Sequence, residues 1–452
     1  MKILRDNVAG QYMQITEKII SLPIPPGAPG FLDQIRGAPR FGTGSGLVPI
    51  RFAVTNSDTQ GCECEVGVIE GLEPGNPVAS MLDFRQREWA SANDFNAILI
   101  VPTGIGAEIG GHAGDATPVA RMLAEFCDNL ITHPNVLNAS DLNEMTENTI
   151  YVEGSILSRL LMGTIGLRKV RSNRVLTIID EHEDELFINS AINAVSAARS
   201  SFGLNCPKVV RMESPVRLTA QYSNSGRAAG RVENFDAITD VLEAERPFYD
   251  AVAIASVIDV PEHYHQKYFN AAGEMVNPWG GVEALLTHSI SSIFDVPAAH
   301  SPMLENRKIA NADVGVVEPR LAAEAVSIAF LHCVLKGLHC SPAIVTEDHQ
   351  ILDPGSISVE QVSCLVIPQG CLGIPTLAAL QQGIPVIAVK ENRNLMKNDL
   401  KALPWAENQY FEVQNYMEAV GLMCAMRAGV DPASTRRPLG STKVEQIAKR
   451  TT

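Results

Sequence analysis

Short apolar runs alternate with longer, partly polar stretches over most of this chain. The runs at 96–102, 174–180 and 251–257 are rich in valine, isoleucine, leucine and alanine, which is typical of buried strands in parallel sheets. The alanine-rich stretch at 186–202 is long enough for a helix. Strands that alternate with helices predict an α/β fold of mostly parallel sheets with flanking helices, in two or more Rossmann-like domains.

Length and composition suggest how the chain is divided. A chain of 452 residues is too long for one ordinary hydrophobic core. Its first part contains many prolines and glycines, which interrupt regular elements. We therefore expect an N-terminal arm with a small strand-rich region at 1–95, a first α/β region with a glycine-rich loop at 96–260, a second α/β region at 261–430 and a polar tail at 431–452.

Charge and targeting patterns narrow the range of partners. The formal net charge of −15 argues against binding to nucleic acid or to an anionic membrane surface, because both require a basic face. The nine cysteines are scattered without a CxxC pair, as expected of reduced, buried thiols. We find no secretory signal pattern and no apolar run of the ~20 residues that a membrane helix needs. These features predict a cytoplasmic protein without a nucleic-acid or membrane partner.

The richest candidate site is the glycine-rich segment PTGIGAEIGGHAGD at 102–115, which precedes an expected helix start. Free backbone N–H groups and the helix dipole favour a phosphate or carboxylate at such a junction. The spacing matches neither the dinucleotide fingerprint nor a P-loop. The alternative is that the glycines only form tight turns. The candidates are the catalytic groups His112 and Asp115 and the backbone donors Gly104, Gly106, Gly110 and Gly111.

A second polar segment, THPNVLNASD, spans 132–141. His133 is a candidate acid or base, and Asn135 and Asn138 are candidate ligand-binding residues. Asparagine also favours turns and helix caps, so a structural role is the alternative for this segment.

Two later segments add a carboxylate and a histidine. In NPWGGVEALLTH, at 277–288, Glu283 falls in the first turn of an expected helix, and Gly280 and Gly281 would let a ligand approach the backbone closely. In VPAAHSPMLE, at 296–305, His300 and Ser301 follow a proline near a strand end and are candidate ligand-binding residues. Without a GxSxG motif, the interpretation of Ser301 as a nucleophile has little support.

The segment IPQGCLGIPTLAALQQGIPVIAVKEN, at 367–392, predicts a βαβ unit. Gln369, Gly370 and Cys371 lie at the turn before its helix, where backbone donors are available to a ligand, and Asn392 follows the second strand. Cys371 near a helix N-terminus is a candidate nucleophile, although most intracellular cysteines are inert.

Metal-binding patterns are weak in this sequence. Asp180 ends an apolar run, where a carboxylate can hold a divalent cation. His263 and His265 have an HxH spacing, which on a strand would direct both side chains to one face. A partly exposed loop is the favoured interpretation, because no third ligand stands at a diagnostic distance. The sequence therefore leaves both metal and cofactor unknown.

Six motifs occur in order along the chain, namely VPTGIGAEIGGHAGDATPVARMLA, LITHPNVLNASDL, YVEG, NPWGGVEALLTH, VPAAHSPMLE and GCLGIPTLAALQQGIPVIAV. Together, over about 96–392, they resemble an uncharacterised domain-of-unknown-function family found in cyanobacteria, other bacteria and plants. The resemblance implies membership of that family and no particular activity, cofactor or substrate.

The leading functional hypothesis is an enzyme that acts on a small anionic metabolite by acid–base chemistry, through hydrolysis or group transfer. His112 and His133 would exchange protons, and Asp115 and Glu283 would orient them or hold a cation. One alternative is a metabolite sensor or assembly factor without catalysis. Another is a structural subunit whose long helical stretch at 316–338 packs between chains. Base rates favour a homo-oligomer.

Overall fold

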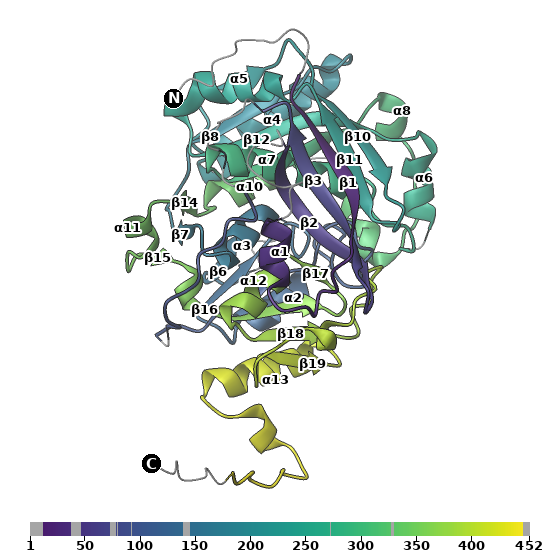
Figure 1. Cartoon of the computed structure of the whole chain (residues 1–452). Coiled ribbons are helices and arrows are strands. Elements are labelled where there is room, and N and C mark those ends of the chain that lie inside the picture. Colours follow the sequence, from purple (N-terminus) through teal and green to yellow (C-terminus); the bar gives the residue numbers. More distant parts are fainter. Residues whose placement is uncertain are drawn as a thin grey trace.

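The computed structural model describes residues 12–37, 47–72, 78, 80–91, 93–138, 145–271, 273–326 and 330–445. Two large sheets dominate it, and in Figure 1 one lies above the other. Helices pack against both sheets. The α/β class predicted from the apolar runs is confirmed.

The upper sheet has ten strands, and their pairing changes from antiparallel at one side to parallel at the other. Its order is β17 (Leu372–Gly373), β2 (Leu47–Ser57), β3 (Cys62–Glu70), β1 (Gln14–Leu22), β11 (Ala228–Glu233), β10 (Arg217–Tyr222), β12 (Ala251–Asp259), β8 (Val175–Ile179) and β9 (Val209–Arg211), with β13 (Ala298–Met303) also paired to β12. Pairing is antiparallel from β17 to β10 and parallel around β12. The N-terminal strands β1, β2 and β3 thus belong to an antiparallel part that continues the parallel part of the same sheet.

The lower sheet has six strands, and all of its pairs are parallel. Its order is β19 (Tyr410–Val413), β18 (Val386–Val389), β16 (Val362–Pro368), β4 (Asn96–Leu99), β5 (Asn129–Thr132) and β6 (Thr149–Tyr151). The chain therefore leaves this sheet after β6 and returns to it at β16. A small third sheet joins β14 (Ala343–Val345), β7 (Gly166–Arg168) and β15 (Ser356–Ile357).

Helices connect and cover these strands. They are α1 (Phe31–Arg36), α2 (Thr117–Ala124), α3 (Gly154–Leu161), α4 (Glu185–Phe202), α5 (Asp236–Glu245), α6 (His263–Asn270), α7 (Gly280–Phe294), α8 (Arg307–Ala310), α9 (Ala322–Val326), α10 (Phe330–His339), α11 (Asp348–Ile351), α12 (Ile374–Gln382) and α13 (Tyr416–Arg427). Helix α4 shows how local signals set their ends. Asp184 accepts a hydrogen bond from the N–H of Leu186 at its start, and Gly203 ends it with a φ of +73°.

Helix α7 is the central connector, because it packs against β11 and β13 of the upper sheet and against α3 below. Gly281 makes this packing possible. A Cβ on Gly281 would lie 2.4 Å from the carbonyl oxygen of Ala228 in β11. We expected Gly281 to let a ligand approach the backbone, but it is strand β11 that packs closely against this glycine.

The stretch at 316–338, expected to be one long helix, is divided instead. It contains a short 3₁₀ turn at Pro319–Leu321, then α9, and then α10. Among the described residues no single helix is long and apolar enough to cross a membrane. The segments Pro319–Val326 and Phe330–His339 meet that test only together, by length and composition, and they are bent by 98°.

Candidate functional site

A cavity of about 970 Å³ lies where the two large sheets face each other. Loops that follow β4 and β5 of the lower sheet line one side of it, and residues that end or follow β12 and β13 of the upper sheet line another. The N-terminal turns of α7, together with α6 and α9, complete the wall. Carboxyl ends of parallel strands from both sheets thus point into one space, the usual place for a ligand in such folds.

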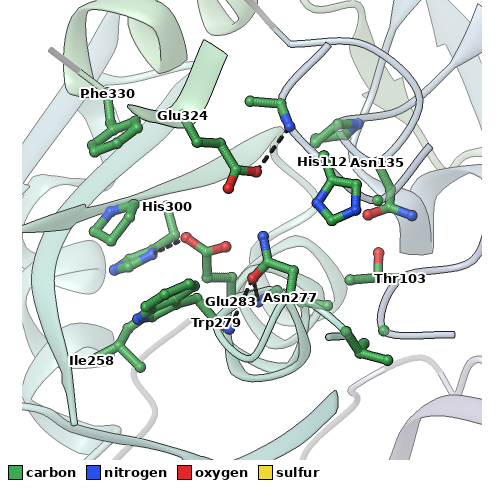
Figure 2. A pocket seen from close by; sticks show the side chains of 18 of the residues that line it. Thr103, His112, Asn135, Ile258, Asn277, Trp279, Glu283, His300, Glu324 and Phe330 are labelled. Atoms are coloured by element: carbon green, nitrogen blue, oxygen red, sulfur yellow. Dashed lines mark hydrogen bonds and ion pairs between the residues drawn. The ribbon is translucent and has the colours of Figure 1, made fainter. Parts of the chain in front are cut away.

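Many of the sequence candidates line this cavity. They are His112, His133, Glu283, Gly104, Gly106, Gly110, Gly111, Asn135, Asn138, Gly280, His300, His263 and His265. Figure 2 shows several of them around a single open space, with His112 and Asn135 on one side and Glu283 and His300 on another. Segments as distant in the chain as 104–113 and 277–283 therefore meet at this cavity.

In the second half of the glycine-rich loop, the four amides at 110–113 already have acceptors within the protein. Gly110 N–H and His112 N–H donate to the carboxylate of Asp115, at 2.8 and 3.2 Å. Gly111 N–H donates to Asn135 O at 2.9 Å, and Ala113 N–H donates to Glu324 Oε1 at 2.9 Å. Side chains of the protein thus occupy the expected anion cradle, and Asp115 supports the loop instead of lining the cavity.

The glycines of this loop are needed for its path. Gly110 has a φ of +94°, and a Cβ there would lie 2.9 Å from Val101 Cγ1 and 3.0 Å from Asn135 O. Residues other than glycine adopt such a backbone conformation at a cost of about 1–3 kcal/mol. Asn392 also serves this loop, because its side chain accepts from Ile109 N–H and donates to Ile109 O. Its expected contact with a ligand is therefore replaced by a structural role.

Glu283 belongs to a hydrogen-bonded chain with His300 and Ser256. His300 Nδ1 lies 2.9 Å from Glu283 Oε1, and His300 Nε2 lies 2.9 Å from Ser256 Oγ. Ser256 is fully buried in β12 and does not line the cavity, so the carboxylate is the end of the chain that a ligand can reach. Ser301, the neighbour of His300 in β13, is buried outside the cavity, because successive side chains of a strand point to opposite faces.

Opposite Glu283, a second carboxylate enters the cavity from α9. Figure 2 shows Glu324 and Glu283 directed towards the same space from two sides. Burial raises the pKa of Glu324 to about 7, and the nearby charges of Asp115 and Glu283 add to that rise. Tyr268 bonds to Glu324 and also lies 2.7 Å, through its hydroxyl, from His112 Nδ1. Burial lowers the pKa of His112 to about 4, and the positive charge of Arg320 contributes.

A third group of side chains lies at the end of β5 and β6. His288 Nε2 is 2.7 Å from Glu153 Oε1. Burial alone would raise the pKa of Glu153, but His288 and Ser155 stabilise its charge and lower the pKa overall. His133 Nε2 accepts a hydrogen bond from Val101 N–H at 3.2 Å, and burial lowers the pKa of His133 to about 4. One ring nitrogen of His133 is thus committed to the backbone, which favours a structural role over proton exchange.

The expected metal ligands do not converge. His263 and His265 lie on helix α6 and not on a strand, so residues two apart point in different directions. His265 Nε2 pairs instead with Glu305 Oε1 at 2.7 Å. Asp180 lines a separate hollow of about 750 Å³ and accepts hydrogen bonds from two backbone N–H groups. Within the described ranges no group of three histidine, cysteine or acidic side chains is arranged to hold a metal ion.

The candidates at 369–371 lie outside the cavity. Gln369 is exposed and faces Glu412, whereas Cys371 is buried, and burial raises the pKa of its thiol. A Cβ on Gly370 would lie 2.8 Å from the carbonyl oxygen of Met396, so this glycine serves chain packing. The inert alternative for Cys371 is therefore favoured over the candidate nucleophile, because its thiol is buried and the next two residues form β17, which pairs with β2.

Sequence reasoning missed Glu324, Tyr268, Trp279 and the partnership of Glu153 with His288. Three of these residues lay within quoted motifs, Glu153 in YVEG at 151–154 and Trp279 and His288 in NPWGGVEALLTH at 277–288. Glu324 and Tyr268 are in ordinary helical surroundings in the sequence, so only their contacts across the cavity single them out.

Comparison with known proteins yields one relative and one family. An uncharacterised lipoprotein of Synechococcus sp. is 35% identical over 347 residues, which is 75% of this chain and 92% of the relative. That relative's designation as a lipoprotein contradicts the cytoplasmic location that we expected from the sequence, and we withdraw that expectation. No solved structure matches the chain. The family described as "Protein of unknown function (DUF3326)" matches residues 96–436. The uncharacterised family suggested by the six motifs is thereby confirmed, and the chain belongs to the DUF3326 family.

Proposed function

We propose that this protein is an enzyme that performs acid–base chemistry on a small polar molecule bound between the two sheets. The observation that carries the proposal is the pair of carboxylates, Glu283 and Glu324, directed into one cavity from opposite sides. Pairs of titratable groups in different environments are how enzymes hold a proton donor and a proton acceptor at one site. Hydrolysis or group transfer is the reaction class that such a pair supports.

Glu324 is the group that would exchange a proton near neutrality. Its pKa of about 7 leaves the protonated and ionised forms similarly populated at pH 7. Ala113 N–H and Tyr268 hold its carboxyl group in place. A fixed carboxyl group that is protonated part of the time can give a proton to a bound molecule or take one from it.

Glu283 is the second group, and its orientation is set by His300. Since His300 contacts Oε1, the other carboxylate oxygen is the one that can accept a proton or hydrogen bond from a ligand. Ser256 in turn fixes the His300 ring from behind. His112, neutral at pH 7 because of its low pKa, adds a ring that can hydrogen-bond a substrate oxygen.

The test compares matched variants on a broad set of substrates. Purified protein is incubated with a fractionated metabolite extract, and mass spectrometry follows which compounds disappear and which form. We expect conversion by the wild type, and loss of about 10²-fold or more in Glu283→Gln and in Glu324→Gln. Glu125→Gln, a change of an exposed carboxylate outside the cavity, is the control and should keep full activity.

Two outcomes would contradict the proposal. If a compound binds the wild type but is never converted, the protein is a sensor and not an enzyme. If both cavity variants convert substrate as fast as the wild type, the carboxylate pair is not the catalytic device.

A further inference from the structure

The cavity also indicates which ligands it accepts, and the first clue is its charge. Seven acidic residues line it, and four of them are buried or half-buried, namely Glu153, Glu283, Glu305 and Glu324. Among the lining residues that the structure describes, Lys308 is the only lysine or arginine. Its side chain is 82% exposed at the rim and already forms an ion pair with Glu262. No cationic side chain of the described lining is therefore available inside the cavity to neutralise an anionic ligand.

The histidines do not reverse this balance. His112 and His133 have pKa values lowered to about 4 by burial, so both rings are neutral at pH 7. Of the four other lining histidines, His263 is exposed and three are each paired with a carboxylate, namely His265 with Glu305, His288 with Glu153 and His300 with Glu283. These rings pair with acidic groups of the wall, and the carboxylate of Glu283 still faces the ligand space in Figure 2.

Several backbone groups that could bind an anion are occupied as well. The loop amides of Gly110, His112 and Ala113 donate to Asp115 and Glu324. At the N-terminus of α7, Trp279 N–H and Gly280 N–H donate to Asn277 Oδ1 at 3.0 and 3.3 Å. The loop amides at 110, 112 and 113 and the first amides of α7 are thus closed to a phosphate or carboxylate by side chains of this chain.

An aromatic surface lies beside Glu283. Figure 2 shows the Trp279 ring next to that carboxylate in the wall of the cavity, with Phe330 across from it. The Tyr268 ring packs against Trp279 at a centroid distance of 5.3 Å and an interplanar angle of 86°. An indole face next to a carboxylate is a favourable environment for an ammonium group, because the ring and the carboxylate both attract positive charge. In addition, Glu305 Oε2 is buried with no hydrogen-bond partner among the described residues.

We infer that the cavity binds a small molecule that carries a protonated amine, held by the carboxylate of Glu283 against the face of Trp279. The inference rests on the proposed function, because it names the substrate class of the same site. It replaces the anionic metabolite that the glycine-rich loop suggested. Hydroxyl groups of the same molecule would find acceptors in the remaining carboxylates and in the neutral ring of His112.

Two matched series of probes test this inference by binding alone. The first is 1,4-diaminobutane, 1,4-butanediol and succinate, and the second is glucosamine, glucose and glucuronate. Within each series the carbon skeleton is nearly constant and the charge changes from positive through neutral to negative. Thermal shift and titration calorimetry with the full chain should show binding of the amine in each series, weaker binding of the neutral compound and none of the acid. Added salt should weaken binding of the amine, because screening reduces the attraction between its positive charge and the carboxylates.

Substitutions in the cavity wall test where the amine binds. Glu283→Gln and Trp279→Leu should each weaken amine binding by about fivefold or more, since each removes one partner of the charge. Glu125→Gln should leave it unchanged. The melting temperature of each variant without ligand reports whether it has folded. The inference is overturned if the acids bind more tightly than the amines, if no amine binds, or if folded Glu283→Gln and Trp279→Leu both bind amines as well as the wild type.

These outcomes separate the inference from the proposed function. Amine binding without conversion of any metabolite supports the ligand class and counts against the enzyme. Conversion of an anionic metabolite that depends on Glu324 supports the enzyme and overturns the ligand class.

Discussion

His300 Nδ1 lies 2.9 Å from Glu283 Oε1, so a histidine in strand β13 of the upper sheet orients a carboxylate that projects from the first turn of α7. On its other side the same ring contacts the buried hydroxyl of Ser256. The order Ser256, His300, Glu283 resembles a nucleophile triad in composition but has the opposite orientation. The carboxylate faces the ligand, and the hydroxyl faces the core.

This orientation predicts unequal effects of two substitutions. His300→Ala should lower the rate of conversion by about 10²-fold, because Glu283 loses the group that orients it. Ser256→Ala should reduce the rate by less than about tenfold, because it removes only a supporting hydrogen bond. Conversion rates in the metabolite assay measure both. A complete loss of activity in Ser256→Ala, together with a covalent adduct on the wild-type serine, would show that Ser256 is a nucleophile after all.

Glu324 predicts a specific pH dependence of stability. Its pKa is raised from 4.5 to about 7, so between these values the folded protein holds a proton that the unfolded chain releases. Raising the pH through this window therefore lowers the free energy of unfolding. Glu324→Gln cannot lose this proton. The melting temperature of the variant minus that of the wild type should increase from about pH 5 to about pH 8. A constant difference over this range would mean that Glu324 titrates normally.

For His133 we expect the opposite pH dependence, with a free energy of unfolding that falls as the pH is lowered. Burial lowers its pKa from 6.5 to about 4, so the unfolded chain takes up a proton in this window before the folded protein does. Its contribution to stability is present above pH 6.5 and is lost as the pH falls towards 4. His133→Gln should unfold less steeply in acid than the wild type, as followed by circular dichroism. Two-dimensional NMR of the histidine rings should show no titration of His133 at pH 6 to 7, in contrast to an ordinary histidine with a pKa of about 6.5.

The glycine-rich loop predicts a strong contrast between two glycines. Gly110→Ala should destabilise the protein by about 1–3 kcal/mol, because a φ of +94° is strained for alanine and its Cβ would contact Val101 and Asn135 too closely. Gly421→Ala is the matched control. Gly421 lies inside helix α13 with open space around it, so alanine should stabilise by up to about 1 kcal/mol. Denaturant unfolding measures both changes, and equal effects would argue against the loop conformation.

The contacts of Asp115 predict that an anion can partly restore the stability of a variant that lacks this carboxylate. Asp115→Ala removes the acceptor of Gly110 N–H and His112 N–H and should cost about 1–3 kcal/mol. Sulfate should restore part of the lost melting temperature, because the two freed amides would then bind it. The wild type should gain less from the same sulfate concentration. If sulfate stabilises the wild type and the variant equally, the carboxylate of Asp115 does not fill the loop.

Local patterns in the sequence were sufficient for the α/β class, for helices such as α4 and for the cluster of polar turns around one cavity. Apolar periodicity and caps depend on residues close in the chain, and the carboxyl ends of parallel strands meet at one edge whatever the details of packing. The sequence could therefore assign His112, His133 and Glu283 to one site, and all three line the cavity, whereas Gly370 and Asp115 do not.

Only the tertiary structure decided what these residues contact. Asp115 and Glu324 close the loop amides, Gly281 admits β11 rather than a ligand, and the pairing of β17 with β2 buries Cys371. Each of these outcomes depends on segments far apart in the chain and on the burial of particular surfaces against one another. Such non-local packing has no periodic trace in the sequence, so the partners of the loop amides could not be deduced from the glycine-rich motif alone.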